Sequence, residues 1–259
     1  MPANADLLAW LRDTCGDFGF DVVALYKREG DHDWPVSAAD AADLERQLED
    51  GGHFLPLPQE PAALANILEV ALVDFVLDRA EVESRVDARR GTERGYPDIE
   101  ISGSRFGGGY HAVDVKVARR AKGGKRTQSK ITLYTGNTYF RYPQLPWPGT
   151  FRPFDDYESH LDLLAIYTLN RESRNRVEDL ELIVEEPWKL ASRQRSSTTR
   201  EYIGAVQSLD DLRAGRGEFK TEADFYDYWR KYKFKIGPAV QQQLDRLLAE
   251  QRRDPKARE

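Results

Sequence analysis

Two short stretches decide the fold: Tyr96-Pro97-Asp98-Ile99-Glu100-Ile101 and Val113-Asp114-Val115-Lys116-Val117. Both alternate polar and apolar side chains, which is typical of β-strands with one buried face. The segment 103–109 between them is rich enough in glycine to reverse the chain. A hairpin centred on Phe106 would place Asp98 directly across from Asp114. Lys116 would share the face of Asp114, because side chains alternate along a strand.

The predicted hairpin brings two carboxylates and one ammonium together. Neighbouring carboxylates repel each other unless a cation lies between them. Mg²⁺ is the obvious cation, since it takes one or two carboxylates, keeps several waters and coordinates phosphate. Lys116 would supply positive charge for a developing oxyanion or help to deprotonate water. The alternative for such a short pattern is a solvated strand edge.

The spacing Pro-Asp, then Asp-X-Lys, is that of the PD-(D/E)XK nuclease superfamily. Other segments resemble the EcoRV-like family of type II restriction endonucleases. They are residues 54–57, 64–98, 130–133, 140–141, 153–157, 215–219 and 222–232. The resemblance covers roughly residues 54–235, with a weaker similarity in 5–30. Asp98, Asp114 and Lys116 fall on the family's catalytic positions, and Glu69 falls on its helical catalytic glutamate.

The resemblance implies a restriction-endonuclease-like α/β fold, with a mixed, mostly five-stranded sheet flanked by helices. It implies a homodimer that hydrolyses both strands of a palindromic DNA site and leaves 5′-phosphates and 3′-hydroxyls. Asp98 and Asp114 would bind Mg²⁺ with the carbonyl of Val115, and Glu69 would serve a second ion or its water. We expect Mn²⁺ to substitute and Ca²⁺ to support binding without cleavage. A DNA methyltransferase is the expected genetic partner.

The resemblance also places base reading on two loops, with Lys130 as a further DNA contact. The loops comprise Thr92, Glu93, Arg94 and Gly95, and Gln194, Arg195, Ser196, Ser197, Thr198 and Thr199. An arginine pairs best with O6 and N7 of guanine, so Arg195 is expected to read a G·C pair. A phosphate contact is its alternative. The alternative functions are a repair or junction-resolving nuclease of the same superfamily, and a DNA-binding protein that has lost catalysis. The latter predicts a broken triad, whereas Asp98, Asp114 and Lys116 are all present.

The charge distribution agrees with a bound polyanion. The 259 residues carry a net charge of -6, yet residues 115–154, 189–200 and 229–235 contain basic residues and no acid. Such tracts around a metal site fit DNA held in a cleft, although they also occur on ordinary soluble surfaces. The lone cysteine, Cys15, allows no intrachain disulfide. With no apolar run long enough for a membrane span and no secretory signal, we expect a cytoplasmic protein.

We expect one domain over residues 1–252, including a dimerisation subdomain and the DNA-reading loops, followed by a flexible tail at 253–259. Periodicity and capping predict helices over 6–14, 38–49, 62–79, 221–233 and 238–252. Strands are predicted over 21–26, 98–101, 110–118, 130–134 and 180–184, a buried helix or strand pair over 157–169, and a loop over 190–202. Glu69 borders the apolar stripe of helix 62–79 and so needs a partner. Glu100 is a candidate to support the metal ligands, and the four histidines are expected to be structural.

Overall fold

A computed structural model describes residues 3–21, 39–49, 60–92, 95–135, 140–173, 176–197, 202–234 and 236–253. The helices are α1 (Ala3–Gly16), α3 (Ala41–Glu49), α4 (Pro61–Glu81), α6 (Pro187–Leu190), α7 (Leu209–Arg213), α8 (Glu222–Lys231) and α9 (Pro238–Arg253). Short 3-10 helices are η1 (Ser104–Phe106) and η2 (Phe154–Asp156). The strands are β1 (Asp87–Arg90), β2 (Ile99–Ser102), β3 (His111–Arg119), β4 (Thr132–Thr135), β5 (Ser159–Leu169), β6 (Val177–Glu185), β7 (Ala191–Arg195) and β8 (Tyr202–Ala205). The predicted strand 21–26 and the start of the predicted helix 38–49 fall largely outside the described residues.

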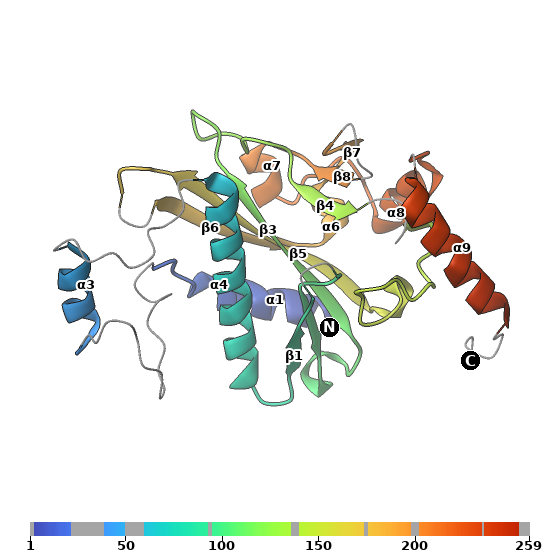
Figure 1. Cartoon of the computed structure of the whole chain (residues 1–259), viewed down its shortest axis with the longest axis horizontal. Coiled ribbons are helices and arrows are strands. Elements are labelled where there is room, and N and C mark those ends of the chain that lie inside the picture. Colours follow the sequence, from blue (N-terminus) through green and yellow to red (C-terminus); the bar gives the residue numbers. More distant parts are fainter. Residues whose placement is uncertain are drawn as a thin grey trace.

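The central sheet has five strands in the order β1-β2-β3-β5-β6 (Figure 1). Only the β3–β5 pair is parallel; the other pairs are antiparallel, so the sheet is mixed. This confirms the α/β fold with a five-stranded mixed sheet. Residues 159–169 form the single long strand β5, and not the helix or the strand pair predicted over 157–169; its side chains are buried from Ser159 to Tyr167. A strand that is buried on both faces lacks the alternation that would have identified it.

Two apolar layers cover the faces of this sheet. Helices α1 and α4 pack on one face, against β6 and against β1 and β3. Their buried residues include the predicted stripe of α4, with Leu64, Leu68, Leu72 and Val76. The other face packs against aromatic side chains, among them Phe225 and Trp229 of α8. The rings of Phe225 and Trp229 are both buried. Thr221 caps α8 through its hydroxyl, which accepts from the Asp224 amide.

A second sheet carries three strands in the order β4-β8-β7, and Figure 1 shows it above the central sheet, near α8. Strand β7 corrects the prediction of a continuous loop over residues 190–202. The polar run Ser192-Arg193-Gln194-Arg195 has no apolar period, but it lies in a strand paired with β8. Across the described residues, none of the helices has the length and apolar character that crossing a membrane requires.

Candidate functional site

The hairpin forms in the predicted register. Ile99 pairs with Val113 and Ile101 with His111, which places Asp98, immediately before β2, across from Asp114. The turn requires Gly103, whose φ is 113°. A Cβ atom there would lie 2.3 Å from the carbonyl oxygen of Arg85. The glycine therefore permits both the backbone conformation and the close approach to the segment before β1.

Asp98, Asp114 and Lys116 meet at the end of this hairpin. Lys116 Nζ lies 2.5 Å from Asp114 Oδ2 and 3.7 Å from Asp98 Oδ2. Asp98 Oδ2 accepts a 2.6 Å hydrogen bond from the backbone amide of Val115, and Lys116 Nζ donates to the Val115 carbonyl at 3.2 Å. The strands thus hold two carboxylates, one ammonium and one carbonyl oxygen together, as the alternation predicts.

The electrostatics of this group are dominated by burial and by mutual repulsion. Burial raises the pKa of Asp114 well above its usual value; Lys116 opposes this effect, while Asp98 adds to it. Burial alone would lower the pKa of Lys116, but Asp114 and Asp98 outweigh it and raise the pKa. The ammonium therefore stays charged at neutral pH. Lys116 carries one positive charge and lies beside two carboxylates, Asp98 and Asp114. The excess negative charge favours binding of a metal cation at this site.

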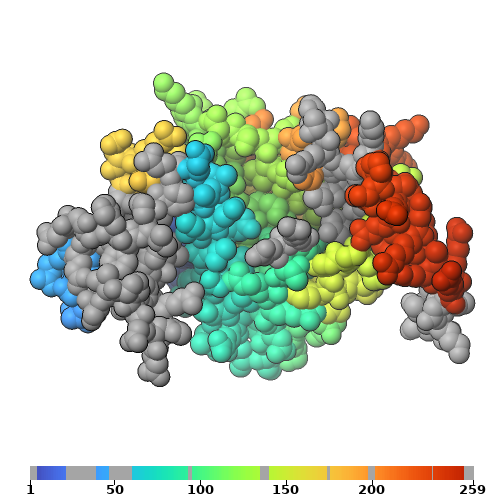
Figure 2. All heavy atoms as spheres, in the orientation of Figure 1, coloured from blue at the N-terminus to red at the C-terminus, as the bar shows by residue number. Residues whose placement is uncertain are grey.

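Glu69 reaches the same site from another element. It lies on α4, half-buried, and lines a cavity of about 710 Å³ together with Asp98, Asp114 and Lys116. Burial raises the pKa of Glu69, Asp98 raises it further, and Lys116 opposes both. Residues of β4 and Tyr202 also line this cavity. Figure 2 shows the cyan atoms of α4 in front of the green atoms of the central segments.

Asp162 is a site residue that the sequence analysis missed. It lies on β5 in register with Asp114 and is fully buried. Neither of its carboxylate oxygens has a hydrogen-bond partner among the described residues. Burial raises its pKa to about 8, although Lys116 opposes the shift. The sequence feature that could have identified Asp162 is its position as a single acid among the leucines Leu161, Leu163 and Leu164.

Tyr96 and His160 support the segment that carries Asp98. The Tyr96 hydroxyl lies 2.6 Å from His160 Nδ1, and the imidazole stacks on Phe154 with ring centroids 3.8 Å apart. Burial lowers the pKa of His160 to about 3, partly offset by a hydrogen bond with the Phe154 backbone, so the ring is neutral. His111 is also buried, between Ser159 Oγ and the Phe106 carbonyl. Both histidines are structural, as predicted; His32 and His53 lie outside the described residues.

Glu100 serves the fold rather than the metal ligands. Its buried carboxylate binds Arg152, at 2.7 and 3.0 Å, and Arg89, whose Nε lies 2.9 Å away. Burial would raise the pKa of Glu100, but hydrogen bonds from the two arginines outweigh it and lower the pKa below the ordinary 4.5. The interpretation of Glu100 as a support for the metal ligands is therefore replaced by an ion-pair network that holds β1, β2 and the segment before η2.

Replacing Glu100 with alanine should lower the free energy of unfolding by about 2–4 kcal/mol, because two arginines lose a buried partner. Urea denaturation at pH 7 measures this, with Glu250→Ala as a control for an exposed acid paired to Arg246. Because the native pKa is lowered, the stabilisation is present above pH 4.5 and is lost as the pH falls through the native pKa. The advantage of the wild type over Glu100→Gln should shrink over that acidic range. A constant difference from pH 7 to pH 3 would contradict the assignment.

Those predicted reading residues that the structure describes lie on or beside the smaller sheet, apart from Thr92 and Gly95, which lie close to Gly149. Gln194 and Arg195 end β7, and Lys130 precedes β4 with its Nζ 2.7 Å from Gln194 Oε1. Ser196 Oγ lies 2.7 Å from Thr132 Oγ1, and Ser197 follows it. Thr92 Oγ1 donates to the Gly149 carbonyl at 3.4 Å. Glu93, Arg94, Thr198 and Thr199 lie outside the described residues.

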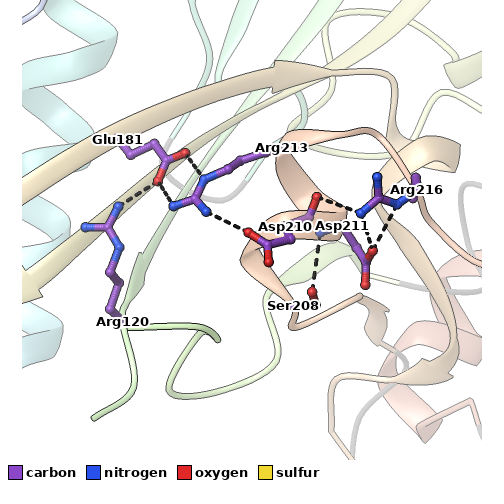
Figure 3. Close-up of polar contacts among 7 residues, drawn as sticks. All are labelled: Arg120, Glu181, Ser208, Asp210, Asp211, Arg213 and Arg216. Carbon is purple, nitrogen blue, oxygen red and sulfur yellow. Dashed lines mark hydrogen bonds and ion pairs between the residues drawn. The ribbon is translucent and has the colours of Figure 1, made fainter. Parts of the chain in front are cut away.

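The basic tracts are partly engaged within the protein. Figure 3 shows Glu181 between two guanidinium groups: Arg120 Nη2 lies 2.6 Å from Oε2, and Arg213 Nε lies 2.6 Å from Oε1. Arg213 also binds Asp210. Arg152 is committed to Glu100. Arg120 and Arg152 are neutralised by acids that lie 61 and 52 residues away in the sequence, so the acid-free tract 115–154 presents less free positive charge than the sequence indicates.

Comparison with known proteins places these residues in context. The family model for restriction endonuclease EcoRV matches residues 30–249, a span that contains Glu69, Asp98, Asp114 and Lys116. The type II restriction enzyme EcoRV of Escherichia coli is 21% identical over 197 residues, which cover 70% of this chain and 78% of that enzyme.

Proposed function

Because the chain belongs to the EcoRV restriction endonuclease family, we propose that it is a type II site-specific deoxyribonuclease that hydrolyses both strands of a palindromic DNA site with Mg²⁺. The observation that carries the proposal is the meeting of Asp98, Asp114 and Lys116 in a cavity of about 710 Å³. Side-chain exposures of 22% for Asp98 and 27% for Lys116 leave both groups accessible from that cavity.

The donor set fits Mg²⁺. Asp98, Asp114 and the Val115 carbonyl offer three oxygen ligands, and one ammonium only partly neutralises the acids. In the part of the chain that the structure describes, no group of three or more His, Cys, Asp or Glu side chains is placed to hold a metal ion, so a cation here would rely on two carboxylates, a carbonyl oxygen and water. An open oxygen site suits an ion that keeps several waters. When bound, Mg²⁺ polarises the scissile phosphate and activates water for attack.

The residues of the chain then have distinct roles. Asp98 and Asp114 hold the cation, while Lys116 stabilises the negative charge that develops on the phosphate oxygens. Glu69, on the facing helix, serves a second ion or its water. The products are a 5′-phosphate and a 3′-hydroxyl. In this proposal the metal ligands come from the hairpin, and α4 contributes Glu69.

Recognition is proposed to reside in the segment around β7, including Gln194, Arg195, Ser196 and Ser197, and in the turn at Thr92. Gly95 packs against the backbone of Gly149, and a Cβ atom on Gly95 would lie 1.7 Å from the Gly149 carbonyl oxygen. Arg195 reads a G·C pair in each half-site, since a guanidinium pairs with O6 and N7 of guanine. The residues Glu93, Arg94, Thr198, Thr199 and Lys130 belong to the same proposal.

Digestion of a plasmid library that carries a randomised segment tests this function directly. With Mg²⁺ or Mn²⁺, sequencing of the fragment ends should show one palindrome of about six base pairs, with at least one G·C pair per half-site. Ca²⁺ should support binding to that site without cleavage, and EDTA should abolish cutting. Cleavage that follows branched or damaged structures and ignores sequence would overturn the proposal in favour of a repair nuclease.

The active form is expected to be a homodimer, because cleavage of both strands of a palindrome requires two catalytic sites related by a two-fold axis. Sedimentation equilibrium at micromolar concentration should give twice the chain mass of 29.7 kDa, both free and with Ca²⁺ on the specific duplex. A monomer under both conditions would contradict a palindrome-cutting restriction enzyme.

A further inference from the structure

A short β-hairpin at residues 119–128, called the basic hairpin below, follows β3 directly. Backbone hydrogen bonds of 2.7 and 2.8 Å join its two arms. Gly123 and Gly124 form its turn with φ values of 99° and 75°, a left-handed conformation that glycine adopts readily. A Cβ atom on either glycine would meet no atom within 4 Å, so the turn projects into solvent. Figure 1 shows this part of the chain, between β3 and β4, at the top of the view.

The backbone of the basic hairpin is held on both sides by the rest of the fold. On one side, the Arg120 amide donates to the Tyr167 carbonyl of β5 at 2.7 Å. The Arg120 guanidinium also binds Glu181 of β6, as Figure 3 shows. On the other side, the Lys125 carbonyl accepts a 3.1 Å hydrogen bond from the Leu209 amide at the start of α7. The hairpin is therefore tied to the central sheet and to α7.

Three cationic side chains of the basic hairpin are exposed, namely Lys122, Lys125 and Arg126. Among the described residues, none of the three charged groups has an acid partner, whereas Arg120 is paired with Glu181. No acid occurs in the sequence from residue 115 to residue 154. Unpaired cations that are held together on a fixed backbone create a positive potential, which attracts a polyanion.

Both arms of the basic hairpin start at the catalytic cavity. Ala118 precedes one arm and Ser129 follows the other, and both residues line the cavity beside Lys116. The turn at Gly123 and Gly124 is five residues from each of them. Because a strand rises about 3.3 Å per residue, the turn lies within about 17 Å of the cavity. Along a DNA duplex, about 17 Å corresponds to about five base pairs.

Resting on the proposed DNA cleavage, we propose that the basic hairpin binds DNA phosphates up to about five base pairs from the scissile phosphate, through Lys122, Lys125 and Arg126. Each strand of a duplex carries one negative charge per about 3.4 Å, so DNA at the cavity presents further phosphates within this reach. Contacts to phosphates carry no sequence information, so the basic hairpin adds affinity for every sequence. It is a surface separate from the segment around β7.

The salt dependence of DNA binding tests this surface. The triple variant Lys122→Gln/Lys125→Gln/Arg126→Gln keeps long polar side chains and removes three charges. Binding to a duplex of random sequence is measured with Ca²⁺ over a range of salt concentrations. The slope of log Kd against log salt should become shallower by about two to three, at about 0.9 for each lost phosphate contact. The single-turnover cleavage rate at saturating DNA and the preferred sequence should match the wild type.

A charge-preserving variant and modified DNA separate a charge contact from a change in shape. Lys122→Arg/Lys125→Arg/Arg126→Lys retains all three charges and should keep the wild-type slope to within about 0.5. Single neutral methylphosphonate linkages in the specific duplex then locate the contact. A linkage up to about five base pairs from the cut should weaken wild-type binding by about threefold to tenfold, but binding by the glutamine variant by less than about twofold.

Removal of charge at another part of the surface is the second control. Arg79, Arg85 and Arg105 lie in the last turn of α4 and around the turn that precedes β3, whereas the basic hairpin follows β3. Replacing all three with glutamine changes the net charge by the same amount. The slope should change by less than about 0.5, because exposed charges beyond a Debye length of about 10 Å are screened.

Four results would overturn the inference and leave the nuclease function intact. They are an unchanged slope in the glutamine variant, an equal change in the charge-preserving variant, an equal change in the Arg79, Arg85 and Arg105 variant, and methylphosphonate effects that are the same in the wild type and the glutamine variant. Failure of the wild type to cut any member of the randomised library would instead contradict the proposed function, and the binding slopes would still test the basic hairpin.

Discussion

Replacing Asp114 with asparagine is expected to lower the rate of DNA cleavage by at least about 10³, equivalent to about 4 kcal/mol of transition-state stabilisation. The amide has the shape of the carboxyl but lacks its charge, and among the groups at the site Asp114 is the acid closest to Lys116, at 2.5 Å. Asp98→Asn should have an effect of similar size, because the two acids hold the cation together. Single-turnover cleavage of the specific duplex with Mg²⁺ measures both losses.

The interpretation depends on an intact fold and an intact DNA-binding surface. Circular dichroism should be unchanged, and the asparagine variants should bind the specific duplex at least as well as the wild type, since a negative charge facing DNA is removed. Asp227→Asn, an exposed acid on α8, is the matched control and should cut at the wild-type rate. Glu69→Ala should be milder, with a loss of about tenfold to a hundredfold, because it acts on the second ion or water. Cleavage by Asp114→Asn within tenfold of the wild type would remove this residue from the catalytic site.

Replacing Lys116 with methionine is the second change with a large expected effect, a loss of about 10²–10³ in the cleavage rate. Methionine keeps the buried stem and removes the charge that stabilises the transition state. Because the ammonium is not a ligand, Mn²⁺ affinity should be unchanged or higher: the lysine competes with the cation for Asp114. Isothermal titration with Mn²⁺ and single-turnover cleavage together separate these two functions.

Lys231→Met is the matched control for Lys116→Met. Lys231 is exposed on α8 and pairs only with Asp227 among the described residues, so both measurements should match the wild type. Loss of all Mn²⁺ binding in Lys116→Met would show that the lysine organises the metal ligands, and the proposed division between Lys116 and the acids would be wrong.

The catalytic hairpin was predictable because its determinants are local. The alternation of polar and apolar residues determines which side chains share a face of each strand. The glycines of 103–109 indicate where the chain reverses direction. Together they predict the register that places Asp98 across from Asp114. The helix α8 was likewise predicted, over residues 221–233, from the capping residue Thr221 with Asp224 three positions on. In each case the residues that determine the structure lie within about 20 positions of one another.

The parts that sequence reasoning missed depend on distant partners. Strand β7 is polar and lacks a period of two, and it becomes a strand through pairing with β8. Glu100 was predicted to support the metal ligands because it lies two residues from Asp98. Its actual partner, Arg152, lies 52 residues away in the sequence and could not be identified from it. Asp162 belongs to the site because β5 pairs in parallel with β3. Two parallel strands are joined by a long crossover connection, so no short stretch of sequence indicates that β3 and β5 pair.

X-ray diffraction at the manganese absorption edge, from crystals of the protein grown with Mn²⁺ and specific DNA, tests the central claim most directly. The account predicts an anomalous peak bounded by the carboxylates of Asp98 and Asp114 and the carbonyl of Val115, with Lys116 beside it and outside its coordination sphere. A peak elsewhere on the protein, or full Mn²⁺-dependent cleavage by the same preparation with no peak at these residues, would contradict it.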